Sequence, residues 1–248
     1  MRTQRKLALL FVAFLLPASC SGKGDDGKAT ATTATTASKG SAAAGGDIEN
    51  PGSADPAKEG VAKAAIVQAS DFPPGWRLQD PQEGLDLEIL WQDITRCLGV
   101  DRKEQPIGFA TSPTYLRGLA TQARATVEYM PEASAQAIAS AFTGPKFKDC
   151  ATEAFTADVK RNAPEGGVPA GPPALSPLDF PKLGQTTSAI RINAAINLSE
   201  LQVPIFQDYI VVFDGGTVTR AVFLNPGSAF PPDLQRSLME KAAARVKG

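Results

Sequence analysis

One segment, DYIVVFDGGTVTRAVFL from Asp208 to Leu224, constrains the fold of this chain more than any other. It reads as two strands joined at Asp214-Gly215-Gly216. Asp-Gly and Gly-Gly steps allow the positive φ angles of a tight hairpin turn. A Gly215-Gly216 loop and an Asp214-Gly215 loop both pair odd residues with even ones. The segment therefore predicts a β-hairpin at the centre of an antiparallel sheet.

The hairpin also predicts how the two faces of this sheet differ, because successive side chains of a strand point to opposite faces. One face carries Tyr209, Val211, Phe213, Val218, Val222 and Leu224, with Arg220 as its one charge. The other face mixes Ile210 and Val212 with Asp214, Thr217 and Thr219. We expect helices to cover the first face.

Two further segments, Thr186–Leu198 and Leu119–Tyr129, alternate in the same way. Their polar positions include Arg124, Arg191 and Asn193. Such a pattern is typical of half-buried strands with one wet face. Apolar residues at helical spacing predict helices over Leu87–Leu98, Pro131–Phe142, Phe147–Val159 and a last one from Pro231-Pro232-Asp233 to Val246. The fold class that we expect is α+β, a single domain in which helices pack mainly on one face of an antiparallel sheet.

The N-terminus reads as an export signal. Arg2, Arg5 and Lys6 precede the ten apolar residues Leu7–Leu16, a run too short to span a membrane. The sequence Leu16-Pro17-Ala18-Ser19-Cys20 then resembles the lipobox of bacterial lipoproteins, although Pro17 stands where that motif has leucine.

The lipobox predicts that residues 1–20 contain a lipoprotein signal peptide and that Cys20 carries the lipid. The domain would then be anchored to the cell membrane on its extracytoplasmic side. The alternative is an ordinary secretory signal with an incidental cysteine, which would make the protein secreted.

Residues 21–60 consist mainly of Ala, Thr, Gly, Ser, Lys and Asp. A segment with so few large apolar residues cannot bury enough surface to offset the entropy of ordering. It predicts a disordered tether, and the alternative is a glycosylated stalk around Ala29–Ser38. We expect the folded domain to span residues 61–248.

Three cysteines are present, at positions 20, 97 and 150. If Cys20 is lipidated, Cys97 and Cys150 remain as an even pair in an exported domain, which predicts a disulfide. Each lies three residues after an apolar residue of a predicted helix, so both thiols can point inward. The alternative is two buried free thiols.

Several classes of chemistry have no signal in this sequence. The chain has no histidine, which excludes Ser-His-Asp and Cys-His catalysis and His-containing zinc sites. We find no phosphate-binding glycine loop, no GxSxG motif and no paired metal ligands. The net charge of −1 gives no reason to expect nucleic acid as a partner. We therefore predict no catalytic residue, metal or cofactor.

One candidate binding site remains on the predicted wet face. Arg124, Arg191 and Asn193 would lie there, under the Pro- and Gly-rich segment Arg161–Leu183, which is long for a plain connection. Two guanidinium groups would suit an anionic or amphiphilic ligand. The alternative is that these side chains only solvate the sheet.

The ordered signals together resemble a family of actinobacterial cell-envelope sensor domains, typified by the PknH-like extracellular domain of a mycobacterial Ser/Thr kinase. The matching stretches are ASDFPPGW (Ala69–Trp76), Cys97, Ala125–Phe142 followed by Cys150, Phe180–Ile192, the central hairpin and the closing LMEKAAARV. Where the family shows an acidic LGDE-like step, this chain has Leu183-Gly184-Gln185-Thr186. The resemblance covers roughly Ala64–Val246. It implies an α+β domain with a non-enzymatic sensing or binding role, and it assigns no ligand.

The sequence thus predicts an envelope lipoprotein whose domain binds an envelope ligand or partner protein. The alternative is a structural or protein-interaction lipoprotein without a small-molecule site. An enzyme is the third possibility, and no residue spacing in the chain proposes one.

Overall fold

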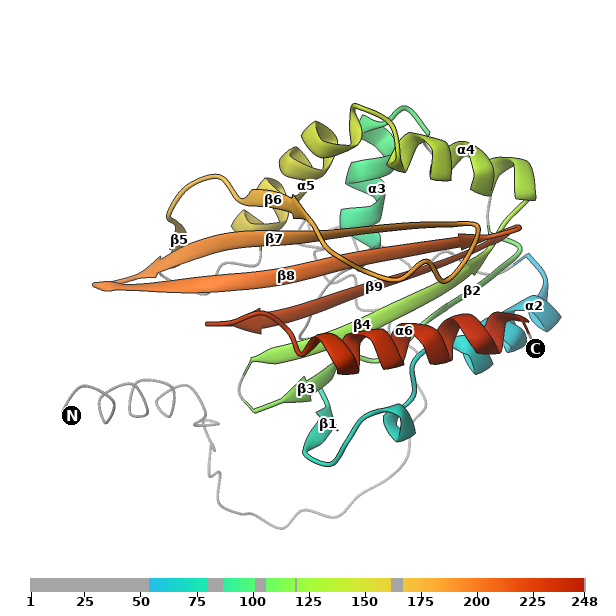
Figure 1. The fold of residues 1–248 in the computed structure, drawn as a ribbon, viewed down its shortest axis with the longest axis horizontal. Coiled ribbons are helices and arrows are strands. Elements are labelled where there is room, and N and C mark those ends of the chain that lie inside the picture. Colours follow the sequence, from blue (N-terminus) through green and yellow to red (C-terminus); the bar gives the residue numbers. More distant parts are fainter. Residues whose placement is uncertain (1–53, 80–86, 101–105, 119, 162–166, 248) are drawn as a thin grey trace, which may run out of the picture. The chain divides into compact units, whose positions relative to one another are not determined.

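A computed structural model describes residues 54–79, 87–100, 106–118, 120–161 and 167–247. Within them, nine antiparallel strands form one sheet in the order β1-β3-β4-β9-β8-β7-β5, with β2 paired to β4 and β6 paired to β7 (Figure 1). The long central strands are β7 (Thr186–Leu198), β8 (Leu201–Asp214) and β9 (Thr217–Pro226). The shorter ones are β1 (Trp76–Leu78), β2 (Gly108–Thr111), β3 (Tyr115–Arg117), β4 (Thr121–Tyr129), β5 (Gly167–Pro169) and β6 (Ala174–Pro177).

The predicted central hairpin is formed by β8 and β9. Asp214 pairs with Thr217, so the loop consists of Gly215 and Gly216. Gly215 has a φ of 57°, which is costly for other residues. A Cβ atom on Gly216 would lie 2.4 Å from the carbonyl oxygen of Met130. Glycine at these two positions therefore allows both the turn and its close contact with the chain after β4.

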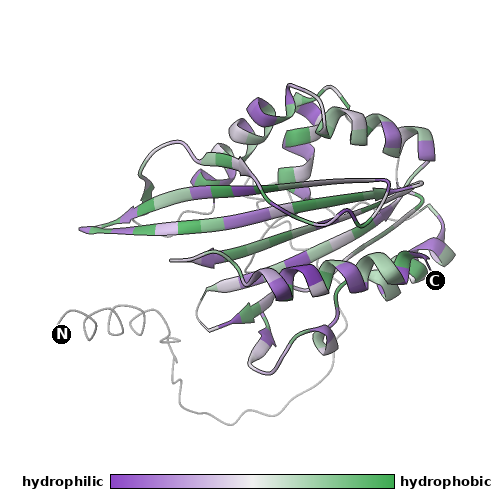
Figure 2. Ribbon diagram, in the orientation of Figure 1, coloured by the Kyte–Doolittle hydropathy of each residue, from purple (hydrophilic) through white to green (hydrophobic). Residues whose placement is uncertain are grey.

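Three helices cover one face of the sheet: α3 (Leu87–Cys97), α4 (Glu132–Phe142) and α5 (Phe147–Arg161) (Figures 1 and 2). Their apolar stripes pack on the face that carries Tyr209, Val211, Phe213, Val218 and Val222, all of which are buried. This arrangement confirms the predicted α+β class and the predicted orientation of the hairpin.

The second face of the sheet is also covered, by α6 (Pro232–Lys247). Leu238, Met239 and Ala242 pack there against Ile210, Val212, Ala221 and Phe223. A further helix, α2 (Pro56–Ala65), lies beside α6 and packs on β2 and β4 through Ala62 and Ala65. The face that we expected to be wet is therefore largely a second core.

Helix α2 also corrects one predicted boundary. Asp55 caps it by accepting hydrogen bonds from the backbone N–H groups of Ala57 and Lys58. Helix α2 therefore begins five residues before the expected start of the domain at Val61. The sequence signal was weak because the stretch before Val61 has no large apolar residue, and the helix packs through alanines.

An ion pair ties α6 to the turn that follows α2. Arg245 donates to both carboxylate oxygens of Asp71, over 2.8 and 2.5 Å. Burial by itself would raise the pKa of Asp71. Hydrogen bonds from Arg245 and from the backbone of Gln68 outweigh burial, so the pKa lies below its ordinary value of 3.8. The charged form is thus favoured in the folded state.

This lowered pKa predicts a pH-dependent part of the stability. A carboxylate whose pKa is depressed on folding stabilises the protein above its unfolded pKa of about 3.9, and this contribution disappears as the pH falls through the folded value. We expect Asp71→Asn to unfold more readily than wild type at neutral pH and to lose less stability below about pH 4. Urea unfolding over a pH series measures both effects. If the free energy of unfolding depends on pH in the same way in both proteins, this role of Asp71 is contradicted.

Candidate functional site

The three predicted ligand-binding residues do not form one site. Arg191 lies in a cross-strand row with Asp208, Phe223 and Ala123, on the face that α6 covers. Arg124 pairs with Val222 and lies on the opposite face, toward the α3–α5 helices. The expectation that both arginines share one face is therefore wrong.

Arg191 is engaged within the fold. Its Nε and Nη2 atoms donate to the two carboxylate oxygens of Asp208, each over 2.7 Å. Asp208 is buried and also accepts a hydrogen bond of 3.0 Å from Gln235 of α6. The hydrogen bonds to Asp208 raise the pKa of Arg191. Gln235 thus links α6 to the sheet through Asp208, and the bidentate pairing with Asp208 leaves Arg191 little capacity to hold a ligand.

Asn193 lies two residues further along β7 and is exposed. Part of the segment Arg161–Leu183 widens the sheet instead of covering it, since β5 and β6 pair with the outer edge of β7. After β6, Leu178, Phe180 and Leu183 pack on the α6 side. Residues 162–166 of this segment lie outside the described ranges.

Arg220, the charge expected on the covered face, is at the centre of a buried cluster. It is fully buried and lies 3.1 Å from Glu88 of α3 and 3.5 Å from Glu128 of β4. The ring of Trp91 lies 4.4 Å from its guanidinium carbon. Burial raises the pKa of the neighbouring Tyr209, although Arg220 opposes the shift. The cluster is closed to solvent, so we assign it to the stability of the fold.

The predicted disulfide is present. Cys97, at the end of α3, is bonded to Cys150 in α5, and the bond spans 53 residues of sequence. It joins two of the three helices on the first face. Cys20 and the rest of residues 1–53 lie outside the described residues.

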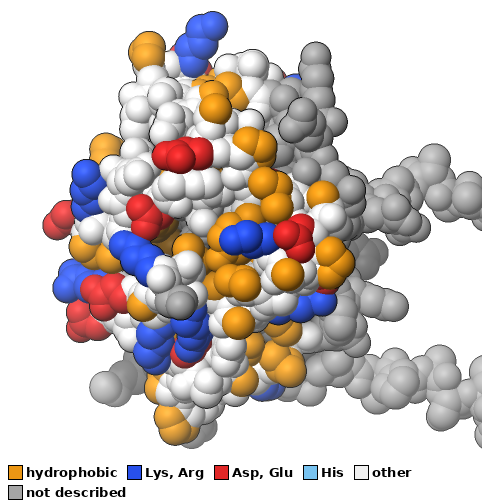
Figure 3. Space-filling model, turned by 90° about the vertical axis from the view of Figure 1, so that its right-hand side faces the viewer, with side chains coloured by type: hydrophobic (Ala, Val, Ile, Leu, Met, Phe, Trp, Pro, Cys, Tyr) orange, Lys and Arg blue, Asp and Glu red, His pale blue; other side chains and the backbone are white. Residues whose placement is uncertain are grey.

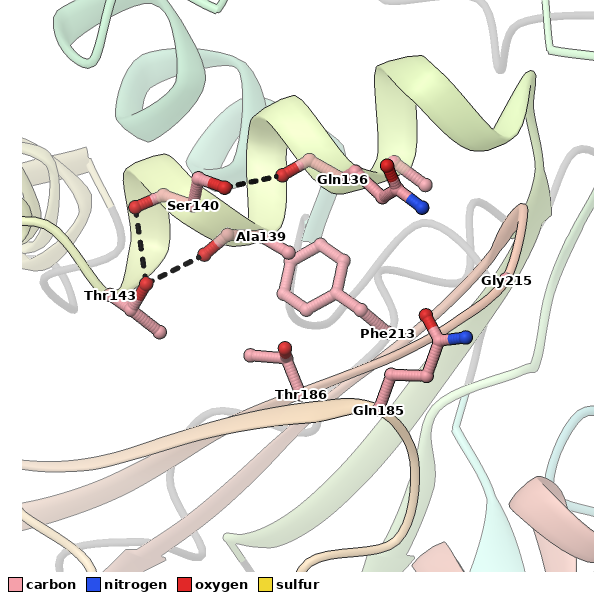
Figure 4. A pocket seen from close by; sticks show the side chains of 9 residues that line it. Gln136, Ala139, Ser140, Thr143, Gln185, Thr186, Phe213 and Gly215 are labelled. Carbon is pink, nitrogen blue, oxygen red and sulfur yellow. Dashed lines mark hydrogen bonds between the residues drawn. The ribbon is translucent and has the colours of Figure 1, made fainter.

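A pocket of about 380 Å³ lies between α4 and the point where β7 and the β8–β9 turn meet (Figure 4). Helix α4 contributes uncharged polar side chains, and the chain at the start of β7 contributes two more. The lining residues are Ala135, Gln136, Ala139, Ser140, Thr143, Gln185, Thr186, Phe213 and Gly215. None of them is ionisable.

The α4 side of the pocket follows from the pattern of that helix. Ala135, Ile138, Ala139 and Phe142 form its buried stripe. Gln136, Ser140 and Thr143, at spacings of four and three residues, follow one another along the neighbouring stripe. Alanines at 135 and 139 leave room between this stripe and the sheet. In Figure 4 the ring of Phe213 lies between α4 and the start of β7.

Sequence reasoning missed this site. It identified the helix and the strand but assigned no role to Gln136, Ser140, Thr143, Gln185 or Thr186. One signal was available, because Gln136 and Ser140 interrupt a helix that is otherwise rich in alanine. Nothing in the sequence, however, shows that this stripe of α4 lies beside the start of β7.

No side chain that lines the pocket is charged. On the face shown in Figure 3, basic and acidic side chains lie among hydrophobic and uncharged ones.

In the described ranges no group of three or more acidic or cysteine residues could hold a metal ion. No helix in those ranges is long and apolar enough to span a membrane.

Comparisons with known proteins find distant structural neighbours. No family model matches the chain, and no curated protein matches it significantly. One solved structure is LpqN of Mycobacterium tuberculosis, described as involved in cell envelope biogenesis. It has 13% identity and a TM-score of 0.24, covering 71% of this chain and 78% of LpqN. Another is PA94 of Pseudomonas aeruginosa, of unknown function and described as a candidate regulator. It has 10% identity and a TM-score of 0.24, covering 50% of this chain and 73% of PA94. The resemblance to PknH-like sensor domains stays a prediction.

Proposed function

We propose that this protein is a lipoprotein of the cell envelope, anchored through Cys20, whose folded domain binds an envelope ligand without catalysis. The observation that carries the proposal is the pocket between α4 and β7. It combines hydrogen-bonding side chains with an aromatic residue, a combination that suits recognition of a small molecule. Its lining offers no carboxylate, thiol or amine that could act as a general acid, general base or nucleophile.

The test is to fill the pocket and ask whether a ligand is lost. The full chain, exported by its own signal and purified from an actinobacterial envelope, is analysed by native mass spectrometry. We expect wild type to retain a bound envelope component. Ser140→Trp places an indole in the pocket and should lower the bound fraction at least about tenfold, the equivalent of ~1.4 kcal/mol.

Ala137→Trp is the matched control. Ala137 is exposed on the same helix but does not line the pocket, so this variant should bind like wild type. Both variants are compared only after thermal melting confirms that they are folded. If no component is retained by wild type, or if Ser140→Trp retains as much as Ala137→Trp, the proposed binding function is wrong.

A second candidate function is protein interaction without a small-molecule site. It is favoured by two large apolar side chains near the end of the β7–β8 hairpin. Val168 in β5 is 61% exposed, and Leu201 at the start of β8 is 49% exposed. Exposed apolar residues close together on an exported domain suit a protein partner. Loss of a cross-linked partner on Val168→Ser with Leu201→Ser, and not on Ser140→Trp, would favour this candidate.

A further inference from the structure

Both hydroxyl groups of the α4 wall of the pocket have used their hydrogen-bond donors, and the Gln136 amide keeps one of its two N–H donors. Ser140 Oγ donates to the carbonyl of Gln136 over 2.9 Å, and Thr143 Oγ1 donates toward the carbonyls of Ala139 and Ser140 (Figure 4). The side-chain amide of Gln136 donates to Glu132 over 3.0 Å. A hydroxyl has one proton and two lone pairs, and an amide oxygen has two lone pairs. This wall therefore offers a ligand mainly acceptors.

The opposite wall keeps both kinds of group. Gln185 and Thr186 have no side-chain hydrogen bond to any residue that the structure describes, and each offers a donor and an acceptor. A ligand that satisfies both walls must supply donors toward α4 and both donors and acceptors toward β7. A hydroxyl group meets both requirements, because it is a hydrogen-bond donor and an acceptor.

The charges near the pocket argue for a neutral ligand. The lining supplies no charged side chain that could pair with a charged ligand. Two acidic residues adjoin the lining: Glu132 accepts a hydrogen bond from Gln136, and Asp214 pairs with Lys247 over 3.3 Å. Glu132 keeps its negative charge and would repel an anion, and Lys247 offsets the charge of Asp214.

An extended peptide is disfavoured at this place. A peptide would normally add to the free edge of a strand. The outer edge of β7 is already occupied, because β6 pairs with Ile190–Asn193 and Leu178 donates to the carbonyl of Ala189 over 3.0 Å. Near the start of β7, Thr187 Oγ1 accepts a hydrogen bond from the backbone of Leu183.

We infer that the pocket binds a neutral, hydroxyl-rich ligand, a saccharide of one or two rings. This inference rests on the proposed binding function and names its ligand class. The volume of about 380 Å³ is near the lower end for small-molecule sites, which limits the bound part to one or two rings. The mixed donors and acceptors match sugar hydroxyls, and Ala139 and the edge of Phe213, which is 2% exposed, are apolar parts of the lining.

The experiment is a ligand-observed NMR titration of the purified full chain. The neutral probes are the methyl glycosides of glucose, galactose and mannose. Glucuronic acid, glucosamine and a capped Ala-Ser dipeptide are the comparison probes. We expect saturation transfer to at least one neutral glycoside and none to the other three. Thr143→Val and Thr186→Val, which keep side-chain shape, should each weaken binding about fivefold, the effect of losing one hydrogen bond.

Thr152→Val is the control, because Thr152 in α5 also donates to a helix carbonyl but lies outside the pocket. It should bind like wild type. The inference is overturned if no neutral glycoside binds at its highest soluble concentration, if a charged sugar or the dipeptide binds better, or if all three variants bind alike. An envelope component that wild type retains and Ser140→Trp loses would still support the binding function after such a failure.

Discussion

Replacing Arg220 with methionine is expected to lower the free energy of unfolding by about 3–5 kcal/mol. The substitution keeps much of the side-chain volume but removes the positive charge between Glu88 and Glu128. Both carboxylates are buried, at 5% and 0% exposure, so water cannot replace the lost partner. The stacking of the guanidinium on Trp91 is lost as well. Chemical denaturation at neutral pH measures the difference.

Arg220→Lys is the informative comparison for this prediction. It keeps the charge but loses the planar group that reaches both carboxylates and faces the indole ring. Its loss of stability should therefore be smaller than that of Arg220→Met. If the free energy of unfolding of Arg220→Met lies within about 0.5 kcal/mol of the wild-type value, the buried cluster does not stabilise the packing of α3 on the sheet.

Removing the disulfide is expected to have an effect of similar size. The Cys97→Ala, Cys150→Ala double variant should lose about 4 kcal/mol, since the bond closes a loop of 53 residues that the unfolded chain otherwise leaves free. The variant should keep its fold, because both helices retain their apolar stripes on the sheet. Denaturation of the variant beside oxidised wild type measures the loss.

Reduction of the wild-type protein gives an independent check. Reduced wild type and the double variant should have similar midpoints, well below that of the oxidised protein. An oxidised protein whose midpoint does not change on reduction would show that the bond adds nothing to stability. Two free thiols in the native protein would refute the bond itself.

Much of the fold could be predicted because its signals are local. The turn at Gly215-Gly216 sets the register of the central hairpin, and the odd–even pairing that it imposes identifies the residues of the covered face. The stripes of α3, α4 and α5 are equally local, since a 3.6-residue period needs no knowledge of distant partners. The even number of cysteines left after Cys20 was sufficient to predict the disulfide.

The predicted binding site failed because it needed the relation between strands that are far apart in sequence. Alternation gives each strand a polar side but not the face on which that side lies. Arg124 of β4 belongs to the α3–α5 side, and Arg191 of β7 to the α6 side. Because helices cover both faces, a polar side chain in the sheet can pair with a buried neighbour instead of with water, as Arg191 does with Asp208. The pocket was missed for the same reason, because its two walls lie more than forty residues apart in sequence.

Hydrogen–deuterium exchange of the full chain, with and without an extract of the envelope, tests the central claim most directly. Bound ligand should slow exchange at the backbone amides of α4 around Gln136–Thr143 and around Gln185–Thr186, because both segments line the pocket. The same extract should not slow exchange at these segments in Ser140→Trp. Protection confined to the region around Arg191 and Asn193, or to the end of the β7–β8 hairpin, would contradict the account, as would an exchange pattern that the extract does not change.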